Sequence, residues 1–201
     1  MSTVTSKYEG KSDEEIRQMV VDAFGPEFRK EEDEVRAELR SESPRASVLV
    51  GAAWLDDYLC QLLTLTLPQD VTVQSVFLAN TRSLGQRIVA AHQLGIIAKT
   101  EKEAMDLIRQ IRNRFAHRTS VSFDDQDVAA LAARLHRYLP ARFSSDSDPA
   151  DQGRSNYVAM VSYYVASLAS RTNCARSLND PAMRLDLLRF VARRVDELTA
   201  S

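Results

Sequence analysis

Successive segments of this chain carry apolar residues at steps of three and four, and this spacing limits the possible folds more than any other feature. In the stretch 104–117, AMDLIRQIRNRFAH, an apolar stripe runs from Ala104 through Leu107 and Ile111 to Phe115. Such a repeat places one apolar face along an α-helix. We find no segment with strand-like alternation of apolar and polar residues. The sequence therefore predicts an all-α fold, a helical bundle of about seven to nine helices.

Helix-capping signals set the predicted boundaries of the stronger helices. Ser43 precedes a proline at the first helical position, and Ser83 opens a helix that Gly95 closes. Thr100, with Glu103 three residues later, is the predicted capping box of the helix that carries the stripe. The predicted elements span about residues 12–24, 27–40, 44–67, 73–80, 84–95, 100–118, 128–138, 155–171 and 181–198.

The chain divides into four predicted parts. Residues 1–42 form N-terminal helices, 43–143 a helical core, 144–154 a polar linker, and 155–201 a C-terminal helical pair packed on the core or on a dimer partner. The predicted helix at 155–171 is apolar on most sides, so it must be buried in this chain or against another. We therefore expect a homodimer. The charge run at 27–40 is interpreted as a solvated face.

Composition argues against several classes of function. The chain has 26 basic and 28 acidic residues and a net charge of -2, which gives no global attraction to nucleic acid or to anionic membranes. No recognition helix is identified, so direct sequence-specific DNA binding is not expected. No apolar run reaches membrane-spanning length, and no signal-peptide core is recognised. Cys60 and Cys174 fit no metal or redox spacing. We expect a cytoplasmic protein without cofactor, metal or membrane association.

The candidate site residues are Arg112, Asn113 and His117, in the last turns of the predicted helix at 100–118. An arginine near an imidazole can bind a phosphate and hold it beside a general acid or base. The alternative is structural: the positive charge of Arg112 is favourable near the helix C-terminus, and His117 caps that end of the helix. Arg87 and His92 repeat the spacing inside an ordinary amphipathic helix. Spacing alone favours the structural interpretation, although packing does not require Asn113.

Four segments together resemble one family of helical proteins. They are residues 43–59 (SPRASVLVGAAWLDDYL), 83–97 (SLGQRIVAAHQLGII), 107–117 (LIRQIRNRFAH) and 122–125 (SFDD). In this order they resemble the mannitol operon repressor (MtlR-like) family over about residues 43–138. That family is all-helical, lacks a recognisable DNA-binding motif and is described as acting in transcription regulation. The resemblance implies a non-enzymatic regulator that works through contacts with a protein partner.

The motif Arg112-Asn113-x-x-x-His117 is also similar to the signature of the HEPN superfamily. Many of its members are metal-independent ribonucleases, and others are non-catalytic interaction domains. This resemblance implies that Arg112 holds the scissile phosphate of RNA, His117 acts as general acid and base, and Asn113 supports both across a dimer cleft. We favour the regulatory function and keep a HEPN-type, toxin-like ribonuclease as the alternative, so enzymatic activity stays open.

Overall fold

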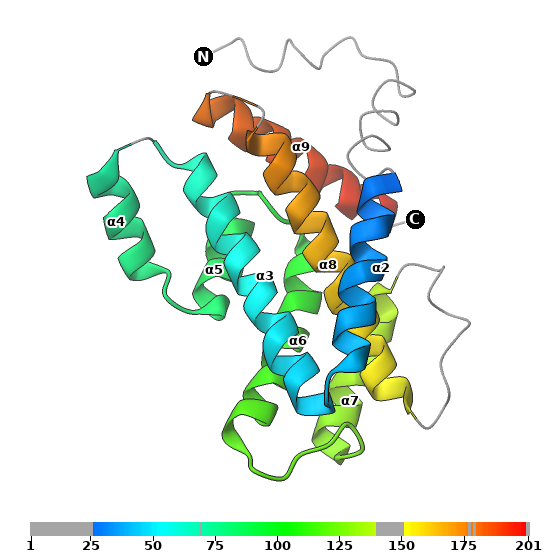
Figure 1. The fold of residues 1–201 in the computed structure, drawn as a ribbon. Helices are drawn as coiled ribbons and strands as arrows, with labels where there is room; N and C mark the ends of the chain where they lie inside the picture. The colour runs from blue at the N-terminus through cyan, green and yellow to red at the C-terminus, as the bar shows by residue number, and fades with distance from the viewer. Residues whose placement is uncertain (1–25, 69, 140–150, 177, 179, 200–201) are drawn as a thin grey trace.

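The computed structural model of this chain is built from helices alone over its described part (Figure 1). It describes residues 26–68, 70–139, 151–176, 178 and 180–199. They form α2 (Pro26–Ser41), α3 (Pro44–Thr66), α4 (Val71–Asn80), α5 (Leu84–Gln93), α6 (Lys99–His117), α7 (Gln126–Leu135), the 3-10 helix η2 (His136–Tyr138), α8 (Gln152–Arg176) and α9 (Pro181–Thr199). These eight α-helices and one 3-10 helix confirm the predicted all-α bundle.

Most predicted elements are present, with shifted ends. The helix predicted from about residue 155 begins at Gln152, inside the stretch predicted as a linker. The predicted helix at 12–24 and the linker residues 144–150 lie outside the described residues. Gly95 follows α5 with a positive φ of 72°, as a glycine after a helix end often does.

Helix α8 runs through the middle of the bundle, with α2, α3, α7 and α9 packed around it (Figure 1). Its side chains are buried along most of its length, which confirms the predicted burial. Tyr157 donates a hydrogen bond of 2.9 Å to the carbonyl of Val48 on α3. At Gly51 a Cβ would lie 2.7 Å from Val161 Cγ1, so glycine lets α3 approach α8 closely. Helices of the same chain cover α8, and its burial therefore requires no second copy.

The apolar stripes meet in one core. The residues predicted to be buried together all belong to it, namely Leu55, Leu59, Ile88, Leu107, Ile111 and Phe115. α3 touches α2, α5, α6, α8 and α9, so it shares this core with most of the bundle. Each helix gains most of its stability from this shared packing, because isolated helices of such lengths are marginal in water.

Helix α3 bears on the expectation about membrane-spanning segments. Among the described residues, α3 is the one helix long and apolar enough to cross a membrane, by length and composition alone. The statement that no apolar run reaches this length is therefore wrong. A buried core helix meets the same criterion, and the contacts of α3 with five other helices account for its composition.

The start of α6 differs from the predicted cap. The N-cap is Ala98, whose N–H donates to Glu101 Oε2 at 2.8 Å, so the predicted box of Thr100 and Glu103 is wrong. Thr100 Oγ1 instead donates to Asp196 Oδ1 on α9 at 3.2 Å. Glu101 is buried, and Arg171 of α8 pairs with it at 2.6 Å. Glu101 is therefore both the buried partner of Arg171 and the acid that accepts the N–H at the start of α6.

The charged helix α2 is not simply a solvated face. Glu32 is only 2% exposed and pairs with Arg36 at 2.5 Å. The two residues are four positions apart on the helix, and the pair lies against the bundle rather than in solvent. Phe28 and Leu39 of the same helix are buried beside it.

The buried Arg171–Glu101 pair yields a stability prediction. We expect Arg171→Leu to lower the free energy of unfolding by about 3–5 kcal/mol, because Glu101 keeps a buried charge without its cation. The matched control is Glu34→Ala, which breaks an exposed pair with Lys30 and should cost less than about 1 kcal/mol. Urea denaturation measures both values. Equal losses in the two variants would contradict a special role for the buried pair.

Candidate functional site

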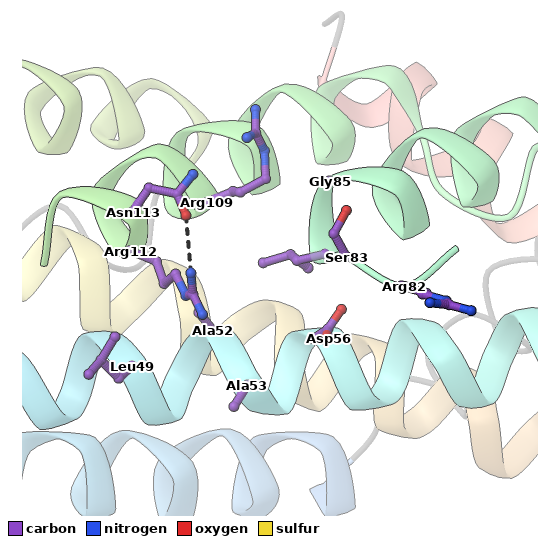
Figure 2. A pocket seen from close by; sticks show the side chains of 11 residues that line it. Leu49, Ala52, Ala53, Asp56, Arg82, Ser83, Gly85, Arg109, Arg112 and Asn113 are labelled. Atoms are coloured by element: carbon purple, nitrogen blue, oxygen red, sulfur yellow. Dashed lines mark hydrogen bonds between the residues drawn. The ribbon is translucent and has the colours of Figure 1, made fainter. Parts of the chain in front are cut away.

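The three predicted site residues do not come together within one chain. Arg112 and Asn113 line the same pocket, and Arg112 Nη1 donates to Asn113 Oδ1 at 3.2 Å (Figure 2). His117 is exposed and does not line it. Five residues along an α-helix turn the side-chain direction by about 140°. Arg112 and His117 therefore face different sides of α6.

The pocket lies between α3, the start of α5 and the second half of α6, with a volume of about 390 Å³. In Figure 2, α3 runs beneath it, α6 forms one side and the segment before α5 forms the other. Its lining residues are Leu49, Ala52, Ala53, Asp56, Arg82, Ser83, Leu84, Gly85, Arg109, Arg112 and Asn113. Small apolar side chains of α3 and basic side chains of the other two segments thus share one cavity.

Asp56 is the acidic residue in this lining, and its charge is already paired. Arg87 of α5 binds Asp56 Oδ2 at 2.5 Å, while Asp56 Oδ1 is enclosed without a hydrogen-bond partner. Burial lowers the pKa of Arg87, and the hydrogen bond and charge of Asp56 more than offset this and raise it overall. His92, five residues later, lies 3.4 Å from the carbonyl of Ile97 through Nδ1. The second Arg-x4-His spacing is therefore structural.

The arginines of the lining are less completely paired. Arg109 Nε donates to Asp106 Oδ1 at 3.3 Å, and Lys102 contacts the same carboxylate at 2.8 Å. Arg112 bonds only the neutral amide of Asn113 among the described residues. Arg82 is exposed and makes no hydrogen bond or ion pair with any residue that the structure describes. The pocket therefore carries a net positive charge.

Arg45 of α3, which the sequence analysis missed, caps the C-terminus of α6. Its guanidinium donates to the backbone carbonyls of Phe115 and Arg118, and to that of Thr119 at 2.9 Å. The assignment of His117 as the cap is wrong, because its side chain makes no hydrogen bond within the described ranges. Local sequence gives no signal for this cap, since Arg45 lies some 70 positions earlier.

Two arginines near the end of α6, Arg114 and Arg118, share the single carboxylate of Asp127 on α7. Arg118 and Arg114 each approach Asp127 Oδ2 at 2.9 Å. The hydrogen bonds from Arg118 and Arg114 lower the pKa of the Asp127 carboxyl below its ordinary value. Among Arg109, Arg112, Arg114 and Arg118, Arg112 is thus the one without a carboxylate partner among the described residues.

Helix α4 is a second candidate surface. None of its residues is buried, and Val71, Val73 and Val76 are 81%, 43% and 58% exposed. In Figure 1 it stands away from the bundle at the left, and it makes few contacts with other helices. Asp70 caps it through hydrogen bonds of 2.7 Å to the N–H of Thr72 and 3.1 Å to that of Val73. The sequence predicted a weakly defined element at about residues 73–80, but it did not predict that this helix would be exposed.

The described residues offer no evident metal site. Within the described ranges, no group of three or more His, Cys, Asp or Glu side chains is placed to hold a metal ion. Cys60 and Cys174 are free thiols, and burial raises the pKa of Cys174 above its ordinary value.

Comparison of the chain with family models, with curated proteins and with solved structures finds no match. The resemblances to the mannitol operon repressor family and to the HEPN superfamily therefore stay predictions. The pocket beside Arg112 and the exposed helix α4 are the two candidate functional features of the described residues.

The cap at the end of α6 can be tested by comparing two variants. We expect Arg45→Ala to lower the free energy of unfolding by about 1–2 kcal/mol, because three carbonyls lose their charged donor. His117→Ala should change it by less than about 0.5 kcal/mol, as an exposed substitution without a bonding partner does. Chemical denaturation followed by circular dichroism gives both values. A larger loss in His117→Ala than in Arg45→Ala would restore the histidine cap.

Proposed function

We propose that this chain is a non-enzymatic, all-helical regulatory protein that acts in transcription regulation through protein–protein contacts. The observation that carries the proposal is the exposure of Val71, Val73 and Val76 on α4, of which Val73 and Val76 lie about 60° apart around the helix and share one side. Exposed apolar side chains that share one side of a helix can mark a site of protein contact. The resemblance to the mannitol operon repressor family supports the regulatory role.

The chemistry of α4 suits a protein partner more than a charged ligand. The sequence VTVQSVFLAN of Val71–Asn80 contains no charged residue. Burying apolar surface gains about 25 cal/mol per Å², so covering the three valines favours association. Interface cores are likewise depleted in charged side chains. This helix has no basic side chain to neutralise the phosphates of DNA, and the chain has a net charge of -2.

We propose that a second copy of the chain covers α4. A two-fold axis lets one apolar patch serve both sides of an interface, and homodimer interfaces are more apolar than others. α4 has no pattern of charges that would select a different partner. The proposed homodimer then presents its remaining surfaces to the regulated partner.

The dimer proposal predicts a mass change from substitutions in α4. We expect the dimer mass for the wild-type chain at micromolar concentration in light scattering. Val73→Asp combined with Val76→Asp should give the monomer mass with unchanged helical circular dichroism, because two carboxylates would be buried unpaired in the interface. Val89→Asp, at an exposed valine of α5, is the matched control and should stay dimeric. A monomeric wild-type chain would contradict the proposal.

A second candidate function is a HEPN-type metal-independent ribonuclease. The observation that favours it is the charge of Arg112, which has no carboxylate partner among the described residues and lines a pocket. Because His117 of the same chain lies outside that pocket, a catalytic pair would have to form between two chains. The interface would then lie at the end of α6, whereas the regulatory proposal places it at α4.

A cleavage assay separates the two functions. We expect wild-type protein not to cleave single-stranded RNA in EDTA. If it does, loss of general acid–base catalysis in His117→Ala should reduce the rate by about 10²–10⁴. His92→Ala is the matched control, because its histidine has the same spacing from an arginine but lies in a structural contact. Metal-independent cleavage that disappears with His117→Ala and persists with His92→Ala would replace the regulatory proposal.

A further inference from the structure

Glu31 of α2 is a partly buried carboxylate that forms no ion pair with any residue that the structure describes. Its hydrogen-bond partner is the hydroxyl of Tyr58 on α3, which donates to Glu31 Oε1 at 3.5 Å, longer than an ordinary O–H···O bond. The next residue, Glu32, shows the contrast, because Arg36 binds it at 2.5 Å. A carboxylate that has lost part of its hydration without gaining a cation favours a cation from outside the chain.

The groups around Glu31 disfavour its negative charge. Burial raises the pKa of the Glu31 carboxyl, the hydrogen bond from Tyr58 offsets this only in part, and the charge of Glu34 adds to the rise. Burial also raises the pKa of the Tyr58 hydroxyl, where the charges of Glu31 and Asp57 act in the same direction and that of Arg176 opposes them. The cation Arg176 therefore does not offset the lost hydration, and a further cation bound at Glu31 would.

Trp54, the one tryptophan of the chain, lies one helical turn before Tyr58 on α3. Residues four apart on a helix differ in direction by about 40°, so both side chains leave the same side of α3. Both are partly buried against the core, and neither ring packs on another aromatic ring among the described residues. Tryptophan and tyrosine are enriched among the residues that carry the binding energy of protein interfaces.

Helices α2 and α3 are joined by residues 42–43 and run in opposite directions (Figure 1). One turn from Glu31 toward this join is Val35 of α2, and one turn from Tyr58 toward it is Trp54. Val35, like Trp54, is partly buried against the core. These four residues form the α2–α3 surface. It has a carboxylate and a phenol at one end, and an apolar side chain and an indole about one turn, roughly 5–6 Å, away.

We infer that the α2–α3 surface binds a basic segment of a protein partner, with an arginine on Glu31 and a neighbouring apolar side chain over Trp54 and Val35. A guanidinium binds a carboxylate through paired, charge-assisted hydrogen bonds and is more weakly hydrated than an ammonium. The faces of aromatic rings such as that of Tyr58 also attract it. One carboxylate supplies too few ligands for a metal ion. The inference names a class of partner for the proposed regulatory function and rests on that function.

Binding of a dye-labelled peptide to the full chain tests this surface. The probe has the sequence GLRALRG with blocked ends, which places an arginine both next to a leucine and one turn from it. At physiological salt we expect a saturable change in anisotropy with a Kd below about 1 mM, and the peptide GLQALQG should bind about tenfold more weakly or worse. Unlabelled GLRALRG should also shift the fluorescence emission of Trp54, because no other tryptophan contributes to the signal.

Three variants separate the charge, the aromatic ring and the fold. Glu31→Gln removes the charge and keeps the shape, so it should weaken the binding of GLRALRG about tenfold. It should not lower the midpoint of urea denaturation, because the wild-type carboxylate has no cation to lose. Trp54→Leu should weaken binding about fivefold or more. Asp151→Asn removes an exposed carboxylate at the opposite end of α8 from Arg176, and this control should bind as the wild type does.

Any of five results would overturn the inference. They are the absence of saturable binding, equal binding of GLQALQG, unchanged emission of Trp54, equal weakening in Asp151→Asn, or a monomer mass for Trp54→Leu beside a dimeric wild type, which would show that a second copy covers this surface. The α4 variant with Val73→Asp and Val76→Asp should bind the peptide as the wild type does. Loss of peptide binding by a dimeric chain therefore rejects this surface alone, whereas a monomeric wild-type chain that binds the peptide rejects the dimer alone.

Discussion

The buried ion pair between Arg171 and Glu101 determines how α6 sits in the bundle. Arg171 Nη2 and Nη1 donate to the two carboxylate oxygens at 2.6 and 3.0 Å, and Nη1 also donates to the carbonyl of Ile96 at 3.2 Å. Glu101 in turn accepts the N–H of Ala98. Burying two charges is costly, and such a pair is tolerated only when hydrogen bonds satisfy it closely. The central helix α8 thereby fixes where α6 begins.

Fixing the start of α6 also fixes its last turns, because a helix of 19 residues transmits its register along its length. Arg45 of α3 holds the far end through backbone carbonyls. Two cations from other helices therefore hold both ends of α6. Arg112 and Asn113, between them, are presented to the pocket by a constrained helix, and a preorganised site loses less entropy when it binds a ligand.

Residue spacing predicted the helices and the core but not the interactions that orient them. The stripe from Ala104 to Phe115 needs only local periodicity, and the structure confirms it. The cap at Thr100 was wrong because the choice of Glu101 depends on Arg171, 70 positions away. The role of Arg45 was missed for the same reason. Arg112 and Asn113 are neighbours in the chain and share a hydrogen bond, whereas their separation from His117 follows from the helical turn between residues five apart.

Helix α4 and the pocket are adjacent in the chain, so a change at one can affect the other. α4 ends at Asn80, Thr81 is buried and donates to the carbonyl of Phe77 at 3.0 Å, and Arg82 follows in the pocket lining. A second copy of the chain that covers α4 would therefore also restrain the segment that enters the pocket lining. A ligand shifts a conformational equilibrium only by its difference in affinity between two states. Covering α4 therefore changes the pocket only if the arrangement of α4 in the dimer favours one of the positions that Arg82 can take, and by linkage any ligand that favours the same position would strengthen dimer formation by the same factor that the dimer strengthens its binding.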